Sequence, residues 1–142
     1  METIETTYQQ ANEFFSVARN YLQIHPEDNK LRYALTRTIK SASRLLGEYQ
    51  DGVEEININN CLAADEGKGA ILRDARGEYQ FTKEGALNRK AQIGELFRKK
   101  VSLNVHFASE LPKDLSLSDR DAFQGFVIRE NDVVESKLEV VN

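Results

Sequence analysis

Few residues of this 142-residue chain have the types and spacing that catalysis or metal binding requires. His25 and His106 are far apart in the sequence, and neither has a clustered partner. A general base or a metal site needs an orienting group or a second ligand. We therefore expect His25 to lie at a helix end and His106 on the solvent side of a strand. Cys61 has no nearby histidine and no second cysteine, which excludes an internal disulfide and argues against a nucleophile.

The acidic and glycine-rich segments give no catalytic pattern either. Glu54 and Glu55 are adjacent in sequence, so on a helix their side chains diverge by about 100° and do not form an acid/base pair. The segment 67–69 (Gly-Lys-Gly) lacks the spacing of a phosphate-binding loop. The sequence thus predicts no catalytic residue, no cofactor and no metal site, and we expect that the protein is not an enzyme.

Basic residues form the most distinctive surface feature. Residues 30–46 carry basic residues and no acidic one, although the chain has a net charge of −4. Arg37, Lys40 and Arg44 recur at spacings of three and four, which places them on one helix face. Such a face can meet phosphates, or acidic surfaces such as those of neighbouring copies, or only solvent. A second basic cluster lies in residues 83–100. The candidate partner-binding residues from the two clusters are Arg37, Lys40, Arg44, Lys90, Arg98 and Lys99.

Length and composition limit the class of protein. A chain of this size is about one domain, here residues 1–142. Hydrophobic residues make up 40% and charged residues 30% of the chain, which is typical of a globular domain with a thin core. No apolar run is long enough for a membrane helix, and the acidic N-terminus does not read as a signal peptide. We expect no membrane contact and a reducing, cytoplasmic environment, consistent with the single cysteine.

Two long helices are predicted for the N-terminal half. Apolar residues recur with a mean period of about 3.6 over residues 3–24 and again over residues 29–61. Pro26 disfavours helix at the residue before it, so the first helix should end near residue 24. The short polar link between the two segments predicts an antiparallel helical hairpin. Gly52 weakens the second helix, and we expect a bend or break there.

The C-terminal half is predicted to mix strands and helices in a unit over residues 70–108. Residues 70–81 read as a β-hairpin around a type I turn, and residues 83–100 as a helix capped by Thr82. Residues 101–108 alternate strictly between apolar and polar side chains, which predicts a half-buried strand. This strand would join the hairpin in a small antiparallel sheet.

The last segments predict a short helix and a charged tail. Ser118 can begin a capping box for a helix over residues 119–128. Its inward face would carry Ala122, Phe123, Phe126 and Val127. Residues 129–142 can add an edge strand or trail free. The fold class predicted from the whole chain is therefore α+β, with a long helical hairpin, a small antiparallel sheet and a short C-terminal helix.

The order of these pieces resembles a known family. A basic amphipathic helix over residues 32–40 leads to the pattern Asp74-x-x-Gly77-x-Tyr79-x-Phe81, then to a charged helix and an alternating strand. This order is similar to that of small uncharacterised proteins encoded in tailed-phage and prophage genomes, often near structural genes. The resemblance covers residues 30–128. It brings no catalytic residues, and it implies a structural or assembly role in the virion or the bacterial host cytoplasm.

Two functions follow from these patterns. The first is a non-enzymatic phage or prophage structural protein that binds other copies or phage proteins and forms a homo-oligomer, because a long amphipathic hairpin buries its face fully only against another layer. The alternative is a regulatory protein that binds nucleic acid through its basic helix faces, with Lys100 added. The acidic net charge and the lack of a helix-turn-helix or an aromatic stacking platform argue against this alternative.

Overall fold

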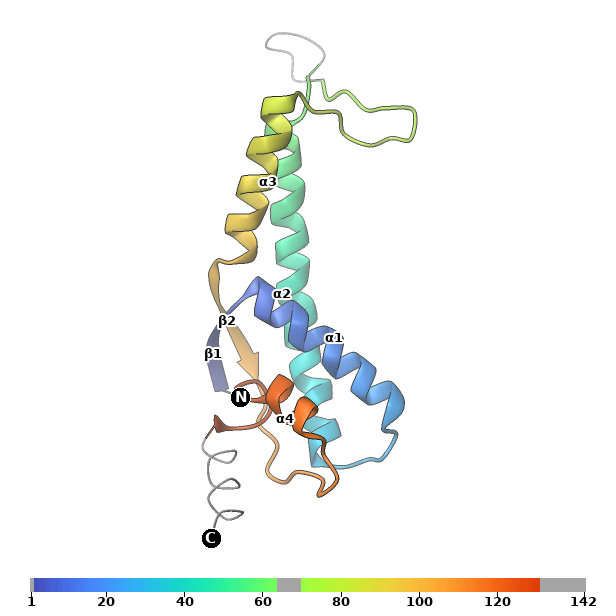
Figure 1. Cartoon of the computed structure of the whole chain (residues 1–142), viewed down its shortest axis with the longest axis vertical. Helices are drawn as coiled ribbons and strands as arrows, with labels where there is room; N and C mark the ends of the chain where they lie inside the picture. Colours follow the sequence, from blue (N-terminus) through green and yellow to red (C-terminus); the bar gives the residue numbers. More distant parts are fainter. Residues whose placement is uncertain (1, 64–69, 131–142) are drawn as a thin grey trace. The chain divides into compact units, whose positions relative to one another are not determined.

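The computed structural model describes residues 2–63 and 70–130, and it confirms the α+β class. Figure 1 shows the order of its elements. They are β1 (Glu2–Thr7), α1 (Tyr8–Ile24), α2 (Lys30–Asn60), α3 (Lys83–Phe97), β2 (Lys100–Val105) and α4 (Leu117–Phe123).

The chain divides into two compact units. We call residues up to 46 and from 100 onward the core unit, and residues 47–99 the helix-pair unit. The helix α2 contributes its first part to one and its second part to the other.

The first helix begins later than predicted. Residues 2–7 form β1 instead of the first turns of a helix over 3–24. Four of these six residues are β-branched, and β-branched side chains favour strands. Ile4 and Tyr8 are four residues apart, which also matches one turn of a helix, and the prediction of a helix at these residues rested on that spacing. Thr7 ends the strand and caps α1, because its side chain accepts a hydrogen bond from the Gln10 N–H at 3.1 Å.

The alternating strand is confirmed, but its predicted partner was wrong. β2 pairs antiparallel with β1, from Lys100 opposite Thr7 to Val105 opposite Glu2. The sheet of the described residues has these two strands alone. Residues 70–81 lie in the helix-pair unit, where an isolated bridge between Arg73 and Tyr79 closes the predicted turn. The flanking runs also pair, since the Asp74 N–H donates to the Glu78 carbonyl oxygen at 2.9 Å and the Gln80 N–H to the Leu72 carbonyl oxygen at 3.4 Å. The predicted hairpin is therefore present around its turn, but it forms no named strand and does not join β2.

The hydrophobic core lies in the core unit, where α1, the first part of α2 and α4 meet. Phe14, Leu35 and Phe123 are almost fully buried there, and the Phe14 and Phe123 rings meet edge to face at 6.1 Å.

The first helix ends at Ile24 as predicted. The Arg32 side chain of α2 donates hydrogen bonds to two carbonyl oxygens, that of Leu22 near the end of α1 and that of His25 just after it. These bonds fix the connection between the two helices.

The short C-terminal helix is shorter and earlier than predicted. α4 covers Leu117–Phe123 instead of residues 119–128, and its cap is Ser116 instead of Ser118. The Ser116 hydroxyl accepts a hydrogen bond from the Asp119 N–H at 3.1 Å. Gly125, with a φ of +86°, turns the chain soon after the helix ends. The predicted inward residues nevertheless face the core, with Phe123 and Val127 fully buried. Residues 131–142, most of the predicted tail, lie outside the described residues.

The helix-pair unit consists of the second part of α2 packed antiparallel on α3 (Figure 1). The Tyr49 and Phe97 rings meet near one end, and Arg89 donates a hydrogen bond to Asn57 near the other. Of the bend or break predicted at Gly52, the break was wrong, because α2 is continuous to Asn60. A Cβ at Gly52 would lie 2.8 Å from a methyl carbon of Leu96, so glycine allows close packing there instead of ending the helix.

Candidate protein-interaction surfaces

The two histidines and the cysteine contact neighbouring side chains and backbone groups. The His106 N–H donates to the Thr38 hydroxyl oxygen at 3.0 Å, and its ring meets the Tyr33 ring at 5.0 Å. His25 stacks on Tyr21 at 4.2 Å. Cys61 donates to the Ile58 carbonyl oxygen at 3.3 Å, just past the end of α2. Across residues 2–63 and 70–130, no group of three or more His, Cys, Asp or Glu side chains could hold a metal ion.

The structure brings three of the predicted binding residues together. Arg37, Lys40 and Arg44 are exposed along one side of α2, opposite the buried residues of that helix. Arg37 lies against Tyr33, where its guanidinium donates to the phenol oxygen at 3.1 Å and lies 5.6 Å from the ring centroid. Within the described chain, none of the three basic residues forms an ion pair with a carboxylate.

The other three predicted residues belong to the helix-pair unit. Lys90, Arg98 and Lys99 are all exposed. Lys90 and Arg98 line a shallow groove of about 530 Å³, together with apolar side chains of α3 and the Tyr49 ring of α2. The side chain of Arg98 folds back over Gly94 in the last turn of α3. These residues offer positive charge beside an apolar groove, which suits a protein surface as well as a phosphate.

The helix-pair unit also exposes its apolar side chains. Every described residue between positions 47 and 99 is half-buried or exposed, and none is buried. Leu87 is 62% exposed and Ile58 46%. Leu87 lines the shallow groove together with Tyr49 and Phe97, and an exposed apolar patch is typical of a surface that contacts another molecule. This exposure could not be predicted from the sequence, because it depends on which segments lie beside the helices.

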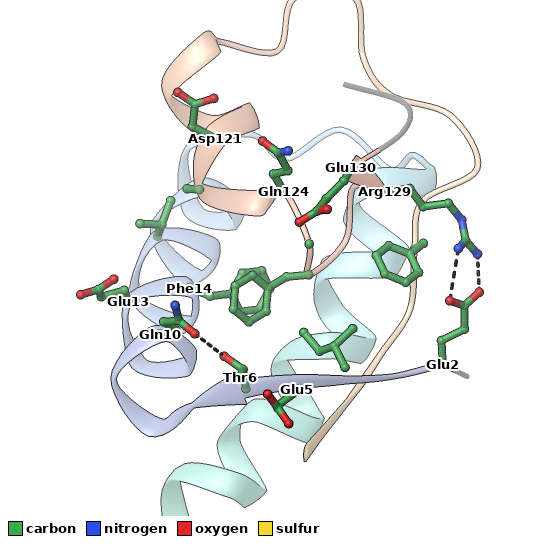
Figure 2. A pocket seen from close by; sticks show the side chains of 16 residues that line it. Glu2, Glu5, Thr6, Gln10, Glu13, Phe14, Asp121, Gln124, Arg129 and Glu130 are labelled. Carbon is green, nitrogen blue, oxygen red and sulfur yellow. Dashed lines mark hydrogen bonds and ion pairs between the residues drawn. The ribbon is translucent and has the colours of Figure 1, made fainter. Parts of the chain in front are cut away.

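A pocket in the core unit was not predicted. It has a volume of about 800 Å³ and is lined by residues of β1, α1 and the segment after α4 (Figure 2). Phe14 and Phe126 stack beside it with ring centroids 4.5 Å apart. These residues come from several distant segments, so no local spacing in the sequence could have indicated the pocket.

The charged residues that line this pocket are mainly acidic. Five carboxylates line it against one cation, Arg129, which forms an ion pair with Glu2 (Figure 2). The hydrogen bond from Arg129 lowers the pKa of Glu2 below its usual value. Arg129 also covers the Phe107 ring at 4.5 Å. A pocket of this charge disfavours phosphate groups, and its lining holds no nucleophile with an adjacent base.

Comparison of the chain with protein-family models, with curated proteins and with solved structures finds no match. Within the described residues, no helix has the length and apolar character needed to cross a membrane.

Proposed function

We propose that the protein is a non-enzymatic structural or assembly component that works by binding further copies of itself. The observation that carries this proposal is the absence of any buried side chain among the described residues of the helix-pair unit. Two helices cannot cover each other's apolar faces fully, and stable architectures add another layer. A second copy of the same chain is the simplest source of that layer, since most soluble oligomers are homo-oligomers.

The apolar side chains of this unit support the same conclusion. Tyr49, Ile93 and Phe97 lie at the contact between α2 and α3, yet each keeps part of its surface exposed. Leu87 projects from α3 beside them with most of its surface in solvent. Covering these side chains in an assembly removes apolar area from water, which favours association by about 25 cal/mol per Å².

We further propose that the assembly is that of a tailed phage or prophage, in the virion or in the host cytoplasm. Support comes from the resemblance carried by Asp74, Gly77, Tyr79 and Phe81. In the structure this motif forms an exposed turn, in which the Asp74 carboxylate accepts hydrogen bonds from the N–H groups of Arg76 and Glu78. The motif thus has a structural role in the chain, because it stabilises this turn.

The test is the solution mass of the full chain by light scattering after size exclusion, at about 50 mM and about 500 mM salt, because salt screens charge contacts. The proposal expects a defined multiple of the 16.2 kDa chain mass that does not require DNA. A particle of 16.2 kDa in both buffers and at every concentration would overturn it.

Nucleic-acid binding is the second candidate. It is favoured by the exposure of Arg37, Lys40 and Arg44 and by their lack of carboxylate partners within the described chain. Phosphate contacts release counterions, so this function requires an affinity for DNA that falls steeply with salt. Adding a DNA duplex to the same experiment separates the two functions, because a monomer that shifts in mass only with DNA at low salt supports the second.

A further inference from the structure

One exposed face of α2 changes sign along its length. Three basic residues on this face are followed by three acidic residues at the same spacings of three and four, which keeps all six on one side of the helix. All six are exposed. The residues are Arg37, Lys40, Arg44, Glu48, Asp51 and Glu55, and they belong to one unbroken helix. We call this set the charged face.

Ion pairs within the described chain do not explain the charged face, although Arg37 donates a hydrogen bond to the Tyr33 hydroxyl. Among the described residues, ion pairs join Lys30 to Glu110, Lys100 to Glu5 and Arg129 to Glu2, and none involves the charged face.

The helix itself gains little from this order of charges. Acidic residues favour the N-terminal end of a helix and basic residues the C-terminal end, which is the reverse of the order found here. Arg44 and Glu48 are one turn apart, but a base placed before an acid is the weaker order of such a pair. The pattern therefore requires another explanation.

We propose that two copies of the chain pair antiparallel along this face, about a two-fold axis near Leu46; this inference rests on the proposed self-association. The members of each opposite-charge pair lie at equal distances on either side of Leu46, to within one residue. Arg37 then meets the partner's Glu55, Lys40 meets the partner's Asp51, and Arg44 meets the partner's Glu48. The two-fold axis repeats each pair, so all twelve charges are matched.

Three other residues fit the same axis. Tyr33 and Ile58 are the exposed large apolar residues of α2, 53% and 46% exposed, and they lie beyond the two ends of the charged face. In the antiparallel pair, Tyr33 of one copy meets the partner's Ile58. Gly47, near the axis, has no atom within 4 Å of the position of a Cβ. Its missing side chain lets the two helices approach closely.

The same pattern argues against nucleic acid as the occupant of this face. A phosphate backbone following α2 past Arg44 meets three carboxylates, which repel it. A second copy, in contrast, neutralises both halves. Exposed ion pairs are individually weak, so the charged face sets the register and orientation of the pair more than its affinity.

Charge reversal tests this pairing. The variant Arg37→Glu/Lys40→Glu/Arg44→Glu has an all-acidic face, and Glu48→Lys/Asp51→Lys/Glu55→Lys has an all-basic face. Each alone should self-associate at least tenfold more weakly than wild type by sedimentation velocity at low salt, because like charges then face each other. An equimolar mixture should associate again as a heterodimer. The matched control is Arg76→Glu/Lys83→Glu/Lys113→Glu, which reverses three exposed basic residues off the charged face and should associate like wild type.

The outcomes separate this inference from the proposed function. The antiparallel pairing is overturned if the wild type associates and neither charge reversal weakens that association. It is also overturned if the mixture of the two variants does not associate. In both cases the proposal that the chain self-associates remains. A wild type that is monomeric throughout overturns both.

A cross-link gives a readout that does not depend on how the reversed variants fold. Gly47→Cys in a Cys61→Ser background places one thiol near the proposed axis, where it meets the same residue of the partner. Mild oxidation should give a covalent dimer on a non-reducing gel. Glu84→Cys in the same background is the control, because it lies on α3 away from the charged face. Equal yields at both positions, or none at position 47, would contradict the pairing.

Discussion

The two units of the chain use the same helix in different ways. In the core unit, α2 packs against the same hydrophobic core as α1 and α4, and Leu31, Leu35 and Thr38 are completely buried. In the helix-pair unit, α2 packs on α3 and accepts a hydrogen bond from the Tyr79 hydroxyl through Glu54, and no described residue is buried. The core unit therefore buries a hydrophobic core of its own, whereas the helix-pair unit leaves its apolar side chains partly in solvent. The comparison predicts that substitutions in the first unit affect stability more than substitutions in the second.

The largest predicted effect is on the core unit. Phe123→Ala removes a fully buried ring that contacts Phe14 and Tyr21. It should lower the free energy of unfolding by about 3–5 kcal/mol, because the cavity left behind cannot be filled by neighbours. Leu87 is mostly exposed, so Leu87→Ala in the helix-pair unit should change it by about 0.5 kcal/mol or less. Urea unfolding at a concentration where the chain is monomeric measures both, and equal losses would contradict the comparison.

A buried hydrogen bond of the core unit gives the next effect. Thr38→Val keeps the shape of the side chain but leaves the His106 N–H without its acceptor. An unpaired buried N–H should cost about 1–3 kcal/mol of stability. Thr36→Val is the control, since Thr36 is exposed on the same helix and its hydroxyl donates only to a carbonyl oxygen one turn back. If the two variants unfold at the same urea concentration, the bond does not contribute as described.

Substitutions at two glycines of α2 test how α2 packs against α3. Gly52→Val pushes against Leu96 and should destabilise the contact between α2 and α3 by about 1–3 kcal/mol. Gly47→Ala meets no atom and should stabilise the helix by up to about 1 kcal/mol. Amide hydrogen exchange of α3 measures this contact, with faster exchange expected for the first variant and unchanged or slower exchange for the second. Slower exchange in both would show that helix propensity, and not the Leu96 contact, governs the unit.

The smallest effect concerns pH. Burial, followed by the nearby Asp114 and Asp119 carboxylates, raises the pKa of Tyr21 above its usual value of 10.0. The stabilising contribution of this group is complete below that usual value and is lost as the pH rises through the pKa of the folded state. Ultraviolet titration of the wild type against Tyr21→Phe should show one tyrosine that ionises late. Loss of an ordinary tyrosine titration in the variant would contradict this burial.

Much of the fold could be predicted because it depends on local patterns. The long periodic runs gave α1, α2 and α3, and strict alternation gave β2. Thr82 was identified as a cap and does accept a hydrogen bond from the Gly85 N–H. The errors arose where two patterns fit the same residues, as at Ile4, or where pairing joins distant segments, as for β1 and β2. Gly52 was misread because its packing against Leu96 has no local signal.

The candidate surface was predicted in part. The basic residues of α2 were recognised because their spacing is local, and the structure places them on one exposed face. Their acidic continuation was not predicted, although Glu48, Asp51 and Glu55 have the same periodicity, because these residues lie beyond the basic run of residues 30–46. The exposure of Leu87 could not be predicted, since it depends on what the rest of the chain leaves uncovered.

The central claim is that the chain associates with itself, and sedimentation equilibrium of the unmodified chain tests it most directly. The mass should rise from 16.2 kDa toward a defined multiple. Mass action requires this rise as the concentration increases from about 1 µM to roughly several hundred µM. A constant mass of 16.2 kDa over this range would contradict the account, because the helix-pair unit would then be stable in water with its apolar side chains uncovered.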